Sequence, residues 1–593
     1  MLYPQNNFYR HAQKLDGVWM FAKDTSDDGE ARGWATQPPA GTIPMPVPAA
    51  FNEITEDPDL RDYFGVAWYF VRLEKPDDSP VHKLRFGAAV YHAGVYLNGE
   101  KLHQSHLGKL PFEVDLSGKW QEGDNLLAVR IDTRLSWQTV PPGCQKSKRI
   151  PDINIEDHQR PEYHFDFLNN GGLLRSVWLL SLPANHLTGI TLKTLSQNDQ
   201  PQGWELCCQA TGSCPVQYRI LDAKGHEVAN ANAKQPSSTV TLHPEYPHLW
   251  SPDSPYLYSL EITLGSDDRY KTKIGLRCIR VVPDAFLLNG SRIYLRGCAT
   301  HEDFHLVGQG HNDARLVRDL TMLKNMGANS FRTAHYPYDE SAYRLADELG
   351  LLVIDETAAV GFNSWTSYPI FSDNRVDEQT LAVHKDMLVR LIERDHMHPS
   401  VVMWSIANEP ACYEAEAEEY FRQLFELCRA SDPECRPTTV VQSSWPESNG
   451  KLVSRSAQFC DVICYNRYAA WYFDPGHLEV VEKQSLDEPI AWRQMFPDKP
   501  VMITEFGADA IAGMHSSPPV MFSEEYQKET IAAYTRSLDK LSYVVGEHVW
   551  NMCDFMTKQG TVRVMGNRKG VHTRDRQPKL AAHFLKERWR RME

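Results

Sequence analysis

The stretch Val401-Val-Met-Trp-Ser-Ile-Ala-Asn-Glu-Pro410 decides the fold of the second half of the chain. A run of apolar and small residues leads directly into an amide, a carboxylate and a proline. This pattern predicts a buried strand that ends in polar side chains. A strand that is apolar on both faces is typical of a parallel sheet covered by helices, and the sequence on both sides repeats the pattern.

Seven further segments combine an apolar strand with a polar end, and amphipathic helices fit between most of them. In the segment Asp313–Met326, Leu316, Leu320 and Leu323 fall on one helical face. Eight β–α units in about 300 residues predict a TIM barrel, which we place at residues 277–593. The other strands are expected at Ile293–Gly297, Asn329–Thr333, Leu351–Asp355, Thr438–Gln442, Val462–Tyr465, Val501–Glu505 and Val545–Trp550.

The residues before the barrel follow a different pattern. Short runs in which apolar and polar residues alternate are separated by turn residues. Trp68–Leu73 and Tyr218–Asp222 are typical of half-buried strands, and Asn98-Gly99 is a strong signal for a hairpin turn. We expect a jelly-roll β-sandwich at residues 1–181 and an immunoglobulin-like β-sandwich of about 100 residues at 182–276. The fold class is therefore multidomain, with two β-sandwiches before an α/β barrel.

The composition excludes several classes of function. The 593 residues include 62 Lys and Arg against 77 Asp and Glu, a net charge of −15, which disfavours nucleic acid or an anionic membrane as a partner. The most apolar segment, Leu173–Ala184, contains Arg175 and is too short to cross a bilayer. The first residues lack the apolar part of a secretory signal, and the twelve cysteines lack CxxC spacing, so we expect a cytoplasmic protein with reduced thiols.

Chemistry in a TIM barrel takes place at the C-terminal ends of the strands, so the strand ends contain the candidate catalytic residues. The fourth strand is followed by Glu409, and the seventh ends in Glu505. Retaining glycoside hydrolysis needs two carboxyl groups about 5–5.5 Å apart, one to protonate the leaving oxygen and one to attack the anomeric carbon. A single carboxylate at a strand end can instead bind a loop backbone, but two on facing walls favour hydrolysis.

Several motifs resemble those of glycoside hydrolase family 2. Ser405-Ile-Ala-Asn-Glu-Pro410 resembles its acid/base motif and Ile503-Thr-Glu-Phe-Gly507 its nucleophile motif. The order sandwich, immunoglobulin-like domain, barrel is also similar, and the resemblance covers essentially the whole chain. Within the family the chain looks most like the β-glucuronidases, because of Asp355–Phe362, Asn466-Arg-Tyr468, Trp471-Tyr472 and Gly566–Gly570.

This resemblance implies a role for individual residues. Glu409 would be the acid/base, Glu505 the nucleophile that forms a covalent glycosyl-enzyme, and Tyr468 would position that nucleophile. Asn408 would hydrogen-bond the sugar 2-hydroxyl. The remaining substrate-binding residues implied by the resemblance are Asp166, His335, Tyr472, Trp550, Arg563, Asn567 and Lys569.

The substrate has a physical argument of its own. A glucuronide carries a carboxylate, and an acidic protein can bind it only with a fixed cation and nearby amide donors. The loop after the eighth strand supplies Arg563, Asn567, Arg568 and Lys569. The resemblance assigns the carboxylate to Asn567 and Lys569, although a basic turn can also be merely solvated. A β-galacturonidase or β-galactosidase of the same family, and a sugar-binding protein on an inactive barrel, remain alternatives.

One motif points to a different mechanism. His301-Glu-Asp-Phe-His305-Leu-Val-Gly308-Gln-Gly-His311 matches the HExxHxxGxxH zinc signature of metalloproteases letter for letter. That chemistry requires His301 and His305 one turn apart on a helix. The segment directly follows the first barrel strand, and two glycines interrupt it, so we expect no helix and no zinc.

We predict a retaining β-glucuronidase that needs no metal or cofactor and acts on small-molecule glucuronides. Family analogy suggests a homo-oligomer, either a dimer or a tetramer. The pKa of Glu409 should be raised, because Glu505 nearby disfavours a second negative charge. The segment between Phe362 and a helix near Thr380 is short, so the sequence does not predict which aglycone the enzyme prefers.

Overall fold

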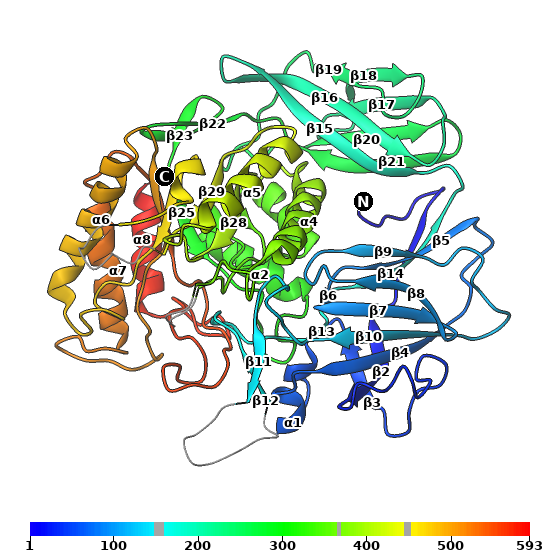
Figure 1. The fold of residues 1–593 in the computed structure, drawn as a ribbon. Coiled ribbons are helices and arrows are strands. Elements are labelled where there is room, and N and C mark those ends of the chain that lie inside the picture. Colours follow the sequence, from blue (N-terminus) through cyan, green and yellow to red (C-terminus); the bar gives the residue numbers. More distant parts are fainter. Residues whose placement is uncertain (148–158, 364–368, 444–451, 593) are drawn as a thin grey trace.

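The structure is a computed structural model that describes residues 1–147, 159–363, 369–443 and 452–592. Figure 1 shows two β-sandwiches and an α/β barrel, which follow one another along the chain. This confirms the predicted fold class. β14 ends at Leu182 and β15 begins at Leu187, while β21 ends at Ile274 and β22 begins at Ile279. The exact domain limits 181/182 and 276/277 stay predictions.

Two antiparallel sheets form the first sandwich, and large side chains such as Phe21, Tyr69 and Phe86 are buried in its core. Asn98 and Gly99 both have positive φ, at 53° and 88°, and form the tight turn between β7 and β8 that the Asn-Gly pair predicts. One sheet has the order β1 (His11–Lys14), β14 (Val177–Leu182), β5 (Val81–Phe86), β9 (Phe112–Asp115); the other has the order β3 (Ile43–Val47), β2 (Gly17–Asp24), β4 (Val66–Leu73), β10 (Asn125–Asp132), β7 (His92–Leu97), β8 (Glu100–Ser105). The smaller elements are α1 (Pro58–Arg61), the pair β6 (Ala89–Val90) and β13 (Gly172–Leu173), and the pair β11 (Cys144–Ser147) and β12 (Gln159–Glu162).

The second sandwich is smaller and has its own core around Trp204, Tyr218 and Leu260. One sheet has the order β15 (Leu187–Gln197), β16 (Gln200–Ala210), β19 (Val240–Leu242), and the other has β18 (Glu227–Ala233), β17 (Val216–Leu221), β20 (Tyr258–Leu264), β21 (Asp268–Ile274). A three-stranded sheet, β22 (Ile279–Val282), β23 (Ala285–Leu288) and β24 (Ser291–Ile293), leads into the barrel.

Eight parallel strands form the barrel, in the order β29 (Thr438–Val441), β28 (Val401–Asn408), β27 (Leu352–Glu356), β26 (Ser330–Arg332), β25 (Leu295–Ala299), β32 (Val544–Val549), β31 (Val501–Glu505), β30 (Ile463–Asn466). A parallel bridge between Gln442 and Tyr465 joins the two ends of this order and closes the barrel. The first strand begins at Leu295 rather than at Ile293, because Ser291–Ile293 pairs with β23 in the preceding hairpin.

Helices cover the outside of the barrel, and their ends follow local chemistry. Asn312 caps α2 by accepting a hydrogen bond from the backbone N–H of Arg315, and Gly350 ends α3 in the left-handed conformation. The helices are α2 (Asp313–Asn325), α3 (Glu340–Leu349), α4 (Glu378–Asp395), α5 (Ala417–Ser431), α6 (Val481–Met495), α7 (Glu524–Leu538) and α8 (Leu580–Arg591). Of the segment between Phe362 and α4, residues 364–368 lie outside the described residues.

The first sandwich packs against the mouth of the barrel. Residues 163–174 lie along the loop that follows β32, where Phe167 forms an antiparallel bridge with Thr557 and the Leu168 N–H donates to the Met556 carbonyl at 3.0 Å. The N–H of His311 donates to the Leu174 carbonyl at 2.7 Å. These contacts place side chains of the first domain beside the strand ends of the barrel.

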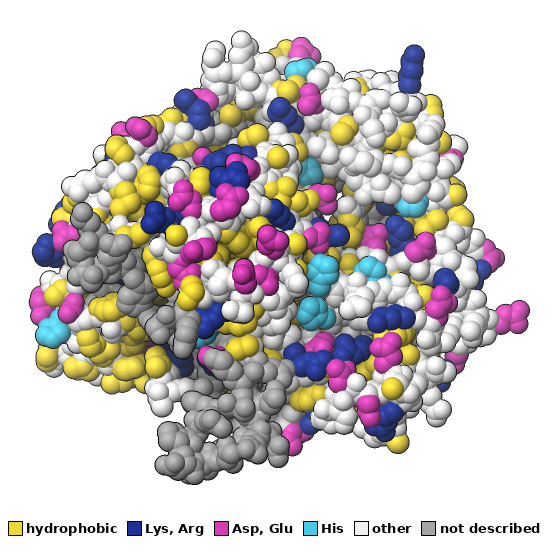
Figure 2. All heavy atoms as spheres, in the orientation of Figure 1, with side chains coloured by type: hydrophobic (Ala, Val, Ile, Leu, Met, Phe, Trp, Pro, Cys, Tyr) yellow, Lys and Arg dark blue, Asp and Glu magenta, His cyan; other side chains and the backbone are white. Residues whose placement is uncertain are grey.

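The helices and the surface charges are consistent with the classes of partner that the composition disfavours, namely membranes and nucleic acid. No helix in the described parts of the chain is long and apolar enough to cross a membrane. On the face in Figure 2, basic and acidic side chains are interspersed rather than gathered into a patch of one sign.

Candidate active site

The C-terminal ends of four barrel strands bring together three carboxyl groups and one guanidinium. They belong to Glu356 (β27), Glu409 (after β28), Glu505 (β31) and Arg332 (β26), and all four side chains are buried or nearly so. Glu409 has a φ of 49°, a left-handed conformation that is uncommon for a glutamate and is typical of functional sites. The two glutamates predicted from strand ends therefore share one barrel mouth.

Arg332 is the centre of this group. Its Nη1 donates to Glu356 Oε1 and Oε2 at 2.9 and 2.7 Å, and its Nη2 donates to Glu505 Oε1. The hydroxyl of Tyr468 donates to the other Glu505 oxygen at 2.5 Å. Glu505 thus has a cationic donor and a phenolic donor that hold its carboxylate in place.

Glu409 is held by neutral groups instead. Asn466 Nδ2 donates to Glu409 Oε1 at 2.8 Å and to Asn408 Oδ1 at 3.1 Å. The Thr504 hydroxyl lies 2.9 Å from Asn466 Oδ1, which fixes the orientation of that amide. No cation makes a hydrogen bond to Glu409 within the described residues, so its carboxyl group is the less stabilised of the two as an anion.

Burial raises the pKa of both glutamates. The pKa of Glu505 rises to about 8, through burial and through the nearby charge of Glu409, against the opposing effect of Arg332. The pKa of Glu409 is raised as well, but burial is the main cause, so the predicted direction is correct and the predicted cause is wrong. Because two donors stabilise the anion of Glu505 and only an amide contacts Glu409, we assign the proton that the pair shares at neutral pH to Glu409.

A second polar group lies in the loop after β32. Lys569 is completely buried, and its Nζ donates to Asp509 Oδ2 and lies 3.1 Å from the Tyr472 hydroxyl. Its ammonium also lies 4.8 Å from the ring centre of Trp471. Burial opposes the charge of Asp509, but Lys569 and Arg563 lower its pKa. The cation predicted from the sequence is therefore present, and an aspartate that was not predicted neutralises it.

The first sandwich contributes to the same group. Asp166 accepts a hydrogen bond from Arg563 Nε at 2.9 Å and from Asn567 Nδ2 at 2.6 Å. Arg563 Nη2 also lies 2.7 Å from the Tyr472 hydroxyl. Asp166, Tyr472, Arg563, Asn567 and Lys569 are thus connected, as their predicted roles require.

Aromatic rings form a wall beside Glu505. The rings of His335 and Trp550 are stacked, with centres 5.0 Å apart and an angle of 18° between their planes. His335 Nδ1 lies 2.8 Å from Glu356 Oε1, and its Nε2 lies 3.6 Å from Glu505 Oε1. Both residues were predicted for the sugar site, and the stacked pair lies beside the proposed nucleophile.

Three family models match the chain in its own domain order. The model described as "Glycosyl hydrolases family 2, TIM barrel domain" matches residues 279–593, the family 2 sugar-binding domain matches residues 12–183, and a third family 2 model matches residues 186–277. The chain belongs to glycoside hydrolase family 2.

Individual relatives match over their full length. The chain is 42% identical to a β-glucuronidase of Paenibacillus borealis, in a match covering 100% of this chain and 99% of the relative. A β-D-glucuronidase structure from Dictyoglomus thermophilum has a TM-score of 0.93 at 40% identity, covering 100% of this chain and 99% of that one. A β-glucuronidase from Ruminococcus gnavus in complex with D-glucaro-d-lactam has a TM-score of 0.91 at 37% identity, covering 99% of both chains.

The zinc-like segment of this family 2 chain does not form a metalloprotease helix. Leu306 and Gly308 have φ values of 75° and 55°, and Phe304 pairs with Gly308 in a tight loop. His301 packs among aromatic rings, His305 is exposed, and His311 lies 2.8 Å from Asp313. Within the described residues no group of three potential ligands could hold a metal ion. This geometry does not support the metalloprotease alternative.

The sequence interpretation missed three residues of the site, namely Arg332, Glu356 and Asp509. Arg332 and Glu356 lie at the ends of predicted strands, so the rule that revealed Glu409 and Glu505 applies to them too. Asp509 follows Glu505 by four residues in the same loop. Their roles depend on partners far away in the sequence, which a strand-end pattern does not reveal.

Proposed function

We propose that this family 2 glycoside hydrolase cleaves β-D-glucuronides to D-glucuronate and an aglycone, with retention of configuration. The observation that carries the proposal is the buried cation of Lys569, connected through Tyr472 to Arg563, in the same barrel mouth as Glu409 and Glu505. A buried ammonium beside amide and phenol donors fits a uronate carboxylate. Asp509 already pairs with Lys569 in this structure, so a uronate carboxylate would be a second acceptor for the ammonium, which a neutral hexose does not supply.

The arrangement suits a double displacement. In the first step the Glu505 carboxylate attacks the anomeric carbon, the bond to the aglycone oxygen breaks, and that oxygen takes the proton of Glu409. In the second step the Glu409 carboxylate removes a proton from water, the water oxygen bonds to the anomeric carbon, and the bond to Glu505 breaks. Tyr468 and Arg332 hold Glu505 for the attack, and Asn408 faces the position of the 2-hydroxyl in this scheme.

A β-galacturonide is the second candidate, because it carries the same carboxylate and differs only at C4. We also infer a dimer or tetramer from family analogy alone, and a cytoplasmic location from the scattered cysteines of the sequence.

The proposal is tested with Lys569→Ala on matched aryl β-glucuronide and β-glucoside. Breaking a buried charge pair costs about 3–5 kcal/mol, so kcat/KM for the glucuronide should fall by roughly 10²- to 10³·⁵-fold. The glucoside has no charge to lose, and its low rate should change little. An aryl β-galacturonide in the same panel separates the two epimers.

Lys579→Ala is the matched control. Lys579 is also buried and donates to Asp554 Oδ1 at 2.8 Å and to the Arg568 carbonyl at 2.9 Å, so it supports the same loop without being one of the proposed substrate-binding residues. Any loss in this variant should be equal on glucuronide and glucoside. An equal loss in Lys569→Ala as well would mean that the Asn567–Lys569 loop is structural and that the carboxylate claim is wrong.

A further inference from the structure

The segment His301–His311 and the lysine that contacts it have no role in the mechanism described so far. Lys109 lies between β8 and β9 of the first sandwich, is only 3% exposed, and is inserted against the barrel. Its Nζ donates to Gln309 Oε1 and lies 4.0 Å from the ring centre of Tyr336. A cation of one domain is therefore buried on an aromatic face of another.

A continuous set of contacts runs from this lysine to the nucleophile. The Tyr336 hydroxyl lies 3.2 Å from Nδ1 of His301, and the His301 ring stands edge-on to Trp550 with centres 5.2 Å apart. Trp550 stacks on His335, whose Nε2 lies 3.6 Å from Glu505 Oε1. Each member is at most 7% exposed, so a shift in one ring displaces the next.

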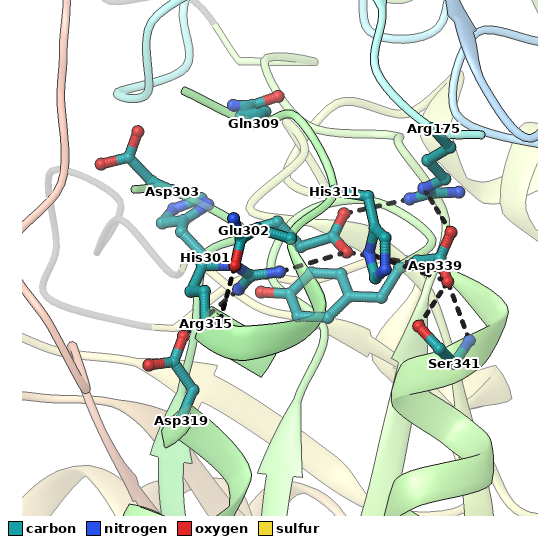
Figure 3. Close-up of polar contacts among 12 residues, drawn as sticks. Arg175, His301, Glu302, Asp303, Gln309, His311, Arg315, Asp319, Asp339 and Ser341 are labelled. Carbon is teal, nitrogen blue, oxygen red and sulfur yellow. Dashed lines mark hydrogen bonds and ion pairs between the residues drawn. The ribbon is translucent and has the colours of Figure 1, made fainter. Parts of the chain in front are cut away.

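Charged groups connect the segment His301–His311 to both the first sandwich and the barrel. Glu302 accepts a hydrogen bond from Arg175 of the first sandwich at 3.0 Å and from the Asp339 N–H at 3.1 Å, and Arg315 of α2 lies 3.8 Å away (Figure 3). Figure 3 shows Glu302 pointing toward Arg175 while His301 lies on the other side of the backbone. The ion pairs and the aromatic contacts thus start from adjacent residues.

The electrostatics favour one arrangement of the His301 ring. Burial lowers the pKa of His301 well below its usual value, and His335 and Lys109 add to the effect, so the ring is neutral. A neutral ring accepts at one nitrogen only, and a cation over the phenol face makes the Tyr336 hydroxyl a stronger donor. Burial lowers the pKa of Lys109 to about 7, so its ammonium form, which favours Nδ1 of His301 as the acceptor, is populated at and below neutral pH.

We propose that Lys109 is a positioning residue for hydrolysis, acting through Tyr336 and His301 on the Trp550–His335 wall beside Glu505. The first sandwich thereby controls the nucleophile's surroundings as well as contributing Asp166. This inference rests on the proposed function for the identity of the substrate, but its effect on rate applies to any glycoside that the chain hydrolyses.

The test compares Lys109→Met with Arg85→Met, a matched control. Arg85 is another buried cation of the first sandwich, 1% exposed, and it pairs with Glu340 of α3 at 2.7 Å, with no contact to the aromatic wall. Lys109→Met should lower kcat about tenfold with KM changed by less than about threefold, because positioning acts on the reacting geometry. Arg85→Met should lower Tm to a similar extent and change kcat by less than about twofold.

Tyr336→Phe removes only the hydroxyl and should reproduce the loss in kcat. Because both changes act on one contact, the double variant should be no slower than the slower single variant. Equal kcat values for Lys109→Met and Arg85→Met, or multiplied losses in the double variant, would overturn the proposal. Rates are measured on whichever aryl glycoside the wild type cleaves, so a wild type inactive on glucuronide but active on another glycoside contradicts the proposed function alone.

Discussion

Two buried charge clusters lie at the strand ends of the barrel, and they differ in their balance of charge. The catalytic cluster, defined as Arg332, Glu356, Glu409 and Glu505, has three carboxyl groups around one guanidinium. In the interdomain cluster, defined as Lys109, Arg175, Glu302, Arg315 and Asp339, each carboxylate lies beside a cation, and Arg315 also pairs with Asp319.

The difference appears in the pKa values. Burial opposes the charge of Glu302, yet Arg175, Arg315 and Lys109 lower its pKa, whereas burial raises the pKa of Glu409 and of Glu505. In the catalytic cluster Glu356 takes two hydrogen bonds from the one guanidinium, and its pKa is lowered despite its burial. A buried carboxylate with enough cations is structural, while a shortage of cations leaves a proton available for chemistry.

The largest expected effect is a difference in kcat between a variant of the catalytic cluster and a variant of the interdomain cluster. Glu505→Gln removes the nucleophile and should lower kcat at least roughly 10³-fold, about 4 kcal/mol of barrier, on every substrate. Glu302→Gln makes the same chemical change in the interdomain cluster and should keep kcat within about tenfold. Steady-state rates of both variants on one aryl glycoside measure this difference. Comparable losses of kcat would contradict the assignment of a catalytic role to one cluster and a structural role to the other.

The next effect concerns stability, where the two variants should move in opposite directions. Glu302→Gln leaves buried cations without their partner and should lower the free energy of unfolding by about 3–5 kcal/mol at pH 7. Glu505→Gln removes a carboxyl group from a site with too few cations and should be neutral or stabilising. Denaturant unfolding of both variants measures this, and a destabilised Glu505→Gln would contradict the shortage of cations.

The pH dependence of these stabilities follows from the signs of the shifts. Between the ordinary glutamate pKa of 4.5 and about 8, the folded pair of Glu409 and Glu505 keeps one shared proton that the unfolded chain has lost, so the pair's contribution to stability falls as pH rises. The advantage of Glu505→Gln should therefore grow from pH 5 to pH 8. The lowered pKa of Glu302 has the opposite consequence, and the cost of Glu302→Gln should shrink as pH falls below 4.5. Parallel trends in the two variants would refute this assignment.

The smallest expected effect is none at all. Treatment with a strong chelator should leave activity unchanged, because the His301–His311 segment is used for interdomain contacts. Elemental analysis of the purified protein provides the second measurement. One zinc per chain, lost together with activity, would show that this segment has another role.

Strand-end patterns predicted the parts of this molecule that depend on local sequence. The barrel, the Asn98-Gly99 hairpin and the placement of Glu409 and Glu505 in one mouth follow from the alternation of apolar runs and polar ends. Family resemblance added Asp166, which no local pattern indicates, and it singled out Asn567 and Lys569 within the basic loop after the eighth strand.

Pairings between distant residues could not be predicted. Asp509 neutralises Lys569 across 60 positions, and Arg332 contacts Glu505 across 173. The cause of the raised Glu409 pKa was misjudged for the same reason, since burial is a property of the folded chain. Lys109 belongs to no sequence motif, and its contact with Tyr336 exists only in the folded chain.

The central claim is tested most directly by trapping the covalent intermediate in Glu409→Ala. An activated aryl β-glucuronide needs little acid assistance to leave, but without the base the second step is slow, so the glycosyl-enzyme should accumulate. Mass spectrometry of the quenched protein should find one glucuronosyl group on the peptide that contains Glu505, and none after mixing with the matching galactoside. Release of the aryl group without an adduct, or an adduct on another residue, would contradict the account.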